Sequence, residues 1–375
     1  MRISSNFDSG NIEVVSLESA KDIQLNIKKD KDSDFYQWFH FKLETSAGEE
    51  HQFSILNAKD AAYPEGWEDY KVLASYDRET WFRVDSEYTD GRLVFNHIPE
   101  FDHVFYAYFV PYSYERHLDL LHEAQMQADT QLITLGETID GRDISVLQIG
   151  QPGEGKKAIW ITARQHPGES MAEWYVEGLL DRLFDLDDAV SRLLMDKAVF
   201  YIVPNMNPDG SVRGHLRTNA NGVNLNREWL TPSKDNSPEV YFVREKMKET
   251  GVDMYLDIHG DEAIPYNFVA GCEGIKSYDA RHQALEEGFK AAYAAATQEF
   301  QDVHGYPKDE PGQALETVAS AWVGEEFKCL SYTVEMPFKD HNDAPDEFYG
   351  WNHVRSAKFG ADALTAVLAV VEKLR

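Results

Sequence analysis

The sequence predicts an α/β protein in which an N-terminal antiparallel β-sandwich precedes an α/β/α domain with a mixed sheet. Three observations lead to this prediction. At 375 residues the chain is long enough for one large core and a smaller one. Its first part is a series of short extended runs, and its second part alternates extended and helical runs. We therefore expect two domains, residues 1–112 and residues 113–375.

The clearest strand pattern in the first part lies at residues 35–43. One of the two alternating sets of side chains there, which begins at Phe35, is nearly all apolar, and this is the period of a strand. Further extended runs are separated by Gly, Pro, Asp and Asn, which favour turns. These runs are residues 22–27, 51–56, 70–76, 80–84, 92–95 and 104–110. Short strands at this spacing predict a sandwich.

The pattern changes after Pro111. Residues 114–127 carry leucines at helical spacing, and beyond them extended and helical runs alternate, as they do in α/β domains. The expected strands are residues 144–149, 158–163, 198–203, 254–258 and 329–334, and the expected helices are residues 169–184, 238–250, 279–300 and 351–374. Sites in such sheets gather where strands end, so the polar residues that directly follow these strands are the candidates for chemistry.

The overall charge argues against nucleic-acid and membrane partners. The chain has 36 basic and 65 acidic side chains, a net charge of −29 that repels phosphate groups. Its start lacks a signal-peptide pattern, and no stretch reaches the length of a membrane span. Cys272 and Cys329 lie far apart, which argues against disulfides and against a thiolate metal site. We expect a soluble cytoplasmic protein in which any metal is bound by His and carboxylates; a homo-oligomer is left open.

Two predicted strand ends carry candidate metal ligands. His166 and Glu169 are separated by a Pro-Gly turn after one strand, so both side chains can reach one ion. His259 follows a second strand. The same His-x-x-Glu spacing also begins at His97, so the spacing alone is a weak signal. Two imidazoles and one carboxylate leave an open position on a tetrahedral zinc, which is the arrangement of catalytic sites.

Each of these candidates also has a purely structural explanation. Glu169 could simply favour the N-terminus of a helix, and His166 could be a satisfied polar residue. Asp257 and Asp261 flank His259, and either could accept its ring N–H or could be a solvated acid.

Two further segments add chemically capable side chains. Glu335 ends an otherwise apolar strand, where a carboxylate can take a proton from an attacking water and pass it to the departing amine. An amide-rich block after residues 198–203 contains Arg217 and Arg227, whose guanidinium groups can bind a substrate carboxylate or polarise a carbonyl. The asparagines of this block could equally satisfy only their own backbone.

Together these motifs resemble the zinc carboxypeptidase family, the fold of carboxypeptidase A, and in detail its cytosolic carboxypeptidase branch. The matching motifs are His166-Pro-Gly-Glu169, Asn207-Pro-Asp-Gly210, Arg217, Asn221-Gly-Val-Asn-Leu-Asn226-Arg227, Asp257-Ile-His259-Gly-Asp261 and Glu335. The first part resembles the β-sandwich of that branch in Phe7-Asp-Ser-Gly-Asn11, Tyr36-Gln-Trp-Phe39 and Pro111-Tyr-Ser-Tyr114. The resemblance thus covers nearly the whole chain.

The resemblance implies a carboxypeptidase-like catalytic domain that binds one Zn²⁺ per chain through His166, Glu169 and His259. It also implies that Glu335 is the base that activates the water at the zinc. The expected activity is removal of C-terminal residues from peptides or protein tails. A zinc-dependent deacylase or amidase acting on an N-acyl amino acid or a cell-wall peptide is the alternative, and an inactive binding module is a third hypothesis.

The resemblance further implies roles for side chains that contact the substrate. Asn226 and Arg227 would grip the terminal carboxylate, and Arg217 would stabilise the oxyanion of the tetrahedral intermediate. Many relatives have Asp where this chain has Asn224, a position expected to support the first zinc histidine. A substrate-contacting tyrosine is usual shortly before the base, and Tyr306 is the only tyrosine in residues 304–324.

Overall fold

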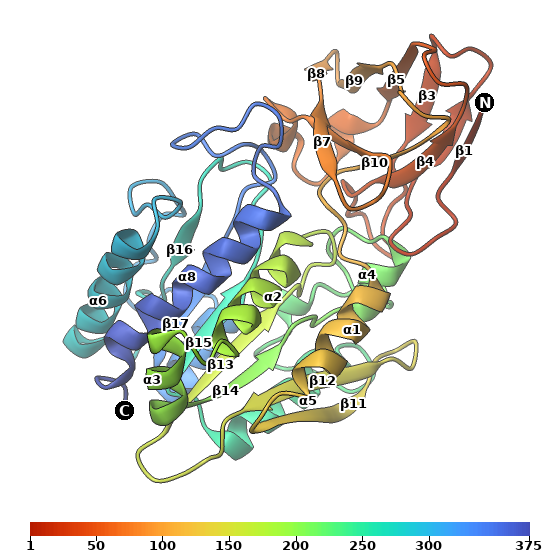
Figure 1. Cartoon of the computed structure of the whole chain (residues 1–375). Coiled ribbons are helices and arrows are strands. Elements are labelled where there is room, and N and C mark those ends of the chain that lie inside the picture. The colour runs from red at the N-terminus through yellow and green to blue at the C-terminus, as the bar shows by residue number, and fades with distance from the viewer.

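The computed structural model describes residues 1–375 and consists of a β-rich N-terminal part packed against a larger α/β part (Figure 1). No helix combines the length and the apolar character that a membrane crossing requires.

The N-terminal part contains two five-stranded sheets. In one sheet the strand order is β1 (Arg2–Ser4), β4 (His40–Glu44), β10 (His103–Ala107), β6 (Val72–Ser75) and β7 (Trp81–Val84). In the other it is β2 (Glu13–Ser16), β3 (Ile23–Asn26), β5 (His51–Ile55), β9 (Arg92–His97) and β8 (Ser86–Thr89). Neighbouring strands are antiparallel except β3 and β5, which are parallel. Phe41 and Tyr106 of the first sheet contact Phe53 of the second, with ring centroids 6.1 and 5.1 Å away, which confirms the predicted sandwich.

The predicted strand at residues 35–43 is regular only from His40 onward. Tyr36 and Trp38, which belong to the other alternating set of this segment, are buried as well. Their polar atoms bond to the backbone: Tyr36 Oη donates to the Asn57 carbonyl at 2.9 Å, and Trp38 Nε1 donates to the Ser9 carbonyl at 2.8 Å. Both faces of this segment are therefore covered by the chain, which a period of two does not reveal.

The α/β part is built on one seven-stranded mixed sheet. Its order is β11 (Thr130–Glu137), β12 (Asp143–Ile149), β14 (Ala198–Val203), β13 (Lys157–Ala163), β15 (Met254–Ile258), β17 (Leu330–Glu335) and β16 (Phe268–Ala270). The central strands β14, β13, β15 and β17 are parallel, whereas β11, β12 and β16 are antiparallel to their neighbours. This arrangement confirms the predicted mixed sheet, although β11 and β16 were not predicted.

Helices cover both faces of this sheet. One face packs against α2 (Met171–Leu183), α6 (Ala280–Ala296) and α8 (His353–Val371), with α1 (Tyr114–Ala124) and α3 (Ala189–Lys197) at its margin. The other face packs against α5 (Pro238–Thr250) and α7 (Ala319–Phe327). The three layers confirm the predicted α/β/α domain. Short helices α3, α7 and α4 (Pro208–Arg213) were not predicted.

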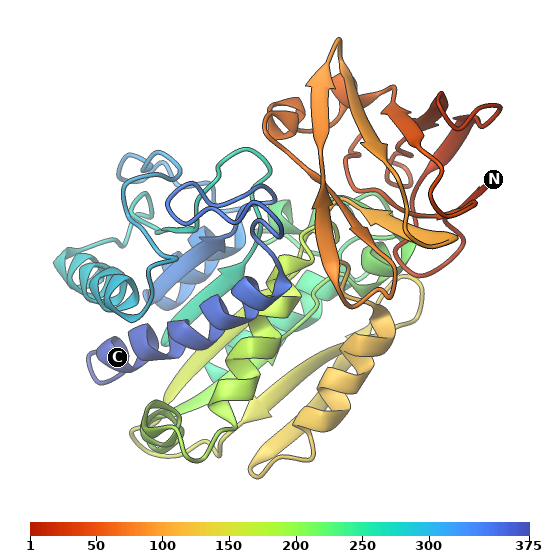
Figure 2. The ribbon, with the colours of Figure 1, turned by 45° about the horizontal axis from the view of Figure 1, so that its top comes forward.

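The register of the parallel strands brings the candidate residues to one edge of the sheet. Ala163 pairs with Ile258, and Ile258 pairs with Val334, so the carboxyl ends of β13, β15 and β17 lie side by side. The sandwich packs at this end of the α/β part (Figure 2). The rings of Tyr108 and Phe338 stack there with centroids 4.6 Å apart. The segments after these strands therefore lie between the sheet edge and the sandwich.

Candidate metal centre and substrate cleft

The three candidate metal ligands meet at the edge of the sheet. Nδ1 of His166 lies 2.7 Å from Oε1 of Glu169, and Nδ1 of His259 lies 2.7 Å from Oε2 of the same carboxylate. The ligand atoms all lie within 4.8 Å of one another, and the three residues are 2–4% exposed. Residues 93 positions apart thus present two imidazole nitrogens and a carboxylate to one point.

Two glycines allow the close approach of backbone to this centre. Gly168 lies between the first two ligands and donates its N–H to the Leu216 carbonyl at 2.8 Å; a Cβ there would lie 3.0 Å from that oxygen. Gly260 follows the third ligand, and a Cβ there would meet the sulfur of Met171 at 2.4 Å. A side chain at either position would push the ligand loops away from their supports.

The outer nitrogen of each imidazole faces a hydrogen-bond acceptor. Nε2 of His166 lies 3.1 Å from Oδ1 of Asn224, and Nε2 of His259 lies 2.8 Å from Oδ2 of Asp257. Both rings can therefore carry their proton on Nε2 and direct the Nδ1 lone pair to the shared centre. The structure brings Asp257 rather than Asp261 to the ring of His259.

The electrostatics of the centre suit a divalent cation. Burial, assisted by nearby Arg217, lowers the pKa of His166 to about 4, so its imidazole is neutral at pH 7. Burial opposes protonation of His259, but the carboxylates of Asp257 and Glu169 outweigh it and raise the pKa of His259 well above its usual range. A cation between these groups would displace that proton. The donor set, two imidazoles and one carboxylate, is the type that catalytic zinc sites use, so the residues fit Zn²⁺.

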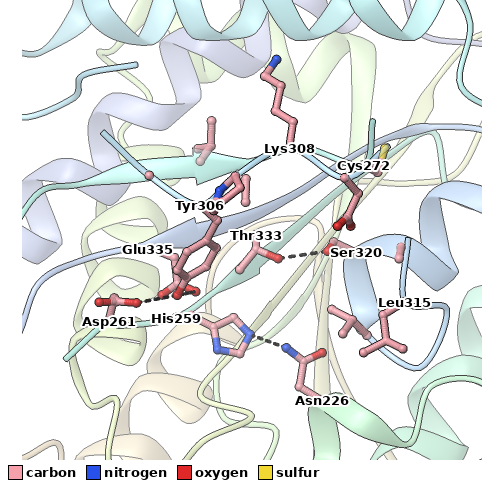
Figure 3. A pocket seen from close by; sticks show the side chains of 18 of the residues that line it. Asn226, His259, Asp261, Cys272, Tyr306, Lys308, Leu315, Ser320, Thr333 and Glu335 are labelled. Atoms are coloured by element: carbon pink, nitrogen blue, oxygen red, sulfur yellow. Dashed lines mark hydrogen bonds between the residues drawn. The ribbon is translucent and has the colours of Figure 1, made fainter. Parts of the chain in front are cut away.

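Glu335 lies beside this centre with one carboxylate oxygen unpaired. Its side chain is buried, Oε1 lies 3.2 Å from the hydroxyl of Tyr306, and Oε2 has no hydrogen-bond partner (Figure 3). Burial raises the pKa of Glu335 well above its usual range, and the neighbouring Glu169 and Asp261 add to this effect. A buried acceptor without a partner costs free energy, so such an atom in a folded protein often has a functional role. Oε2 of Glu335 is free to accept a proton or a hydrogen bond from a group in the cleft.

Tyr306 arrives at the site from the long loop between α6 and α7. Its hydroxyl donates to Oδ2 of Asp261 at 2.6 Å (Figure 3). Its ring packs edge-on against Phe268. The tyrosine therefore stands next to Glu335 and over the mouth of the site, while Asp261 holds it there.

All of the site residues predicted from the sequence line one cleft of about 670 Å³. Asn226 uses Oδ1 to accept the backbone N–H of Ala319 at 2.8 Å, which leaves its amide nitrogen 3.5 Å from Nε2 of His259. Burial lowers the pKa of Arg227, and the positive charge of Arg217 adds to this effect. Neither arginine forms an ion pair with a side chain of the protein. The cleft thus contains a cationic patch next to the metal centre, suited to carboxylate or oxyanion groups.

Other asparagines of the amide-rich block serve the backbone. Oδ1 of Asn205 accepts the N–H of Asn207 at 2.8 Å, and Oδ1 of Asn207 accepts the N–H of Gly210 at 3.1 Å as the N-cap of α4. Nδ2 of Asn207 donates to the carbonyl of Gln165 at 3.0 Å, which ties the block to the loop that carries His166.

The structure adds cleft residues that sequence reasoning missed. Tyr63 and Glu65, both from the sandwich, line the same cleft as the metal ligands. Cys272, Lys308, Leu315, Ser320 and Thr333 also line this cleft (Figure 3), as does Glu273. No local motif marks these residues, because their place depends on how distant segments pack.

Comparisons with known proteins agree with this geometry. Residues 3–109 match the model of the cytosolic carboxypeptidase N-terminal domain, and residues 114–352 match that of zinc carboxypeptidase. The chain is 30% identical over 310 residues to cytosolic carboxypeptidase 2 of Xenopus tropicalis, a match that covers 72% of this chain but only 32% of that protein.

Two solved structures resemble the whole chain. A protein assigned as a carboxypeptidase A from Shewanella denitrificans shares 55% identity, with a TM-score of 0.99 over 100% of both chains. The metallo-carboxypeptidase from Pseudomonas aeruginosa, solved in complex with (2-guanidinoethylmercapto)succinic acid, shares 46% identity, with a TM-score of 0.98 over 100% of both chains. The chain therefore belongs to the zinc carboxypeptidase family and is a zinc-dependent metallocarboxypeptidase.

Proposed function

We propose that the protein removes C-terminal residues from peptides or protein tails, with Glu335 as the general base. The observation that carries this proposal is the meeting, in one cleft, of the ligand set, an unpaired buried carboxylate and two guanidinium groups without acidic partners. Held by His166, Glu169 and His259, Zn²⁺ would act as a Lewis acid toward the scissile carbonyl and the attacking water.

The chain's own side chains account for the remaining steps. Oε2 of Glu335 accepts a proton from the attacking water, and Glu335 then delivers this proton to the departing amine. Arg217 donates hydrogen bonds to the carbonyl oxygen as negative charge develops there. Asn226 and Arg227 hold the terminal carboxylate, and Tyr306 covers the bound terminal residue. A carboxylate-bearing compound bound to the Pseudomonas aeruginosa relative agrees with a cleft that receives carboxylates.

The free terminal carboxylate is expected to be essential for cleavage. Amidation of the C-terminus removes the charge that Arg227 would bind, so kcat/KM should fall by about 100-fold, the value of two charge-assisted hydrogen bonds. A mixed peptide library, with free or amidated ends and with or without a chelator, is digested and analysed by mass spectrometry. Equal cleavage of both forms would indicate an amidase instead, and cleavage that survives the chelator would contradict the zinc mechanism.

Asn224, the neutral hydrogen-bond partner of His166, is expected to limit the affinity of the site for zinc. Asn224→Asp keeps the acceptor at Nε2 of His166 but adds a negative charge behind the ligand, which should tighten zinc binding by about tenfold. Chelator competition measures the Kd. Asn221→Asp is the matched control, since Asn221 donates to the Asp235 carbonyl and does not contact a ligand. An unchanged Kd in Asn224→Asp would remove Asn224 from this role.

We further propose a domain boundary at residues 112 and 113 and a cytoplasmic location. The boundary is supported by the end of β10 at Ala107 and the start of α1 at Tyr114. The location is supported by the relatives that are named cytosolic carboxypeptidases.

A further inference from the structure

A buried carboxylate of the sandwich holds the loop that carries Arg217. Asp30 is 2% exposed and lies between β3 and β4. Its Oδ1 accepts the N–H of Leu216 at 2.7 Å, and its Oδ2 accepts the N–H groups of Arg217 and Thr218 at 2.8 and 2.9 Å. The Thr218 hydroxyl donates to the same oxygen at 3.0 Å. One carboxylate thus binds four donors on three consecutive residues of the other domain.

The same turn of the sandwich also supports the Arg217 side chain. The N–H of Asp30 donates to the Phe35 carbonyl at 2.8 Å, which closes the turn. The guanidinium carbon of Arg217 lies 5.6 Å from the ring centroid of Phe35 and 5.4 Å from that of Tyr63. Aromatic faces at this distance attract a guanidinium without occupying its N–H groups. The sandwich therefore fixes both the backbone and the head group of Arg217 and leaves its donors free.

The loop that Asp30 holds is also in contact with the metal-ligand loop. The Leu216 carbonyl accepts the N–H of Gly168, which lies between His166 and Glu169. A shift of the Leu216–Thr218 segment would therefore change the distance between the guanidinium of Arg217 and the metal centre. The guanidinium of Arg217 forms no ion pair with a side chain of the α/β domain, and the buried carboxyl of Glu262 acts on it only at longer range.

We propose that Asp30 is a positioning residue for Arg217, so that the sandwich supplies part of the transition-state stabilisation of the neighbouring domain. This inference rests on the proposed function, in which Arg217 acts on the carbonyl oxygen. The sandwich then contributes to the active site, because the rings of Phe35 and Tyr63 and the carboxylate of Asp30 fix the orientation of the Arg217 side chain.

The competing explanation is that Asp30 only joins the two domains. Asp8 provides the comparison, because its Oδ2 accepts the N–H of Tyr114 in the α/β part at 2.8 Å without contacting the Arg217 loop. Both Asp8→Asn and Asp30→Asn remove a carboxylate from a contact between the domains. Only the second change releases Arg217.

Asp30→Asn is expected to lower kcat by about 100-fold, the size of effect that a displacement of a catalytic group by about 1 Å produces. KM and zinc content should stay near wild type, because the carboxylate grip and the metal ligands are not touched. Asp8→Asn should keep the wild-type kcat. Equal losses of kcat in the two variants, or a loss confined to KM, would overturn the proposal.

A double-mutant cycle separates positioning from general destabilisation. In the Arg217→Ala background, Asp30→Asn should cause no further loss of kcat, because the group it positions is gone. If the double variant instead loses kcat by the product of the two single losses, the proposal is overturned. If Asp30→Asn does not fold, Phe35→Leu takes its place in the same cycle, with the same expected result and the same contradicting one.

A measurement without turnover completes the test. Hydrogen exchange of the amides of residues 216–218 should accelerate in Asp30→Asn and stay slow in Asp8→Asn, and unchanged exchange in Asp30→Asn would overturn the proposal. A wild-type protein that cleaves no free peptide would overturn the proposed function and this inference with it. An active wild type whose kcat survives Asp30→Asn would overturn the inference alone.

Discussion

Glu335→Gln is expected to bind zinc like the wild type and to lose turnover by about 10²–10⁴-fold, the usual contribution of a positioned general base. Glutamine keeps the shape of the side chain and an oxygen for the Tyr306 hydroxyl, but its amide cannot take a proton. The change replaces Oε2 of Glu335, the oxygen that has no hydrogen-bond partner, by an amide nitrogen. Steady-state kinetics on a peptide cleaved by the wild type, with zinc measured by atomic absorption on the same samples, would report both quantities.

Glu65→Gln is the matched control for this change. Glu65 is an exposed acid on the sandwich side of the cleft, and its side chain forms no ion pair. The Glu65→Gln variant should keep the wild-type rate, because it removes the same charge at a position away from the reacting atoms. A Glu335→Gln enzyme that retained most of its activity would exclude Glu335 as the base.

His166→Ala is expected to lose zinc as well as activity. Loss of even an outer partner of a metal ligand typically costs about 10–100-fold in affinity, so removal of one of three ligands should exceed that range. Glu169 would keep only one imidazole neighbour, and the remaining pair of ligands cannot enclose a tetrahedral ion. Zinc content after dialysis against a weak chelator, and the Kd from competition with a fluorescent indicator, measure the effect.

His97→Ala offers a control with the same local spacing. His97 also precedes a glutamate by three residues, but it lies at the end of β9, where its Nδ1 is 2.8 Å from the Tyr106 hydroxyl. This variant should keep stoichiometric zinc. Full zinc occupancy in His166→Ala would contradict the assignment of His166 as a ligand.

The sequence predicted those parts of the fold whose signals are local. Buried parallel strands such as β13 and β15 are largely apolar runs, and their ends are marked by polar residues, so both the sheet and the candidate ligands His166 and His259 could be predicted from the sequence. Short edge strands such as β2 and β16 escaped prediction, because few residues with mixed burial give neither a period of two nor an apolar run. The three-residue spacing of His and Glu could not by itself separate His166 from His97; the fold did.

The chemistry of the site was determined by the sequence, and its geometry only by the tertiary structure. Residue type alone specified two imidazoles, a carboxylate and an acid at strand ends, because ligand and proton chemistry are properties of side chains. Three contacts of the site depend on packing between segments as far apart as residues 30 and 218. They are the contact of His259 with Asp257, the hydrogen bond from Tyr306 to Asp261, and the hydrogen bonds from the Arg217 loop to Asp30. Such contacts form only when packing overcomes the entropy of closing long loops, and no local pattern records that outcome.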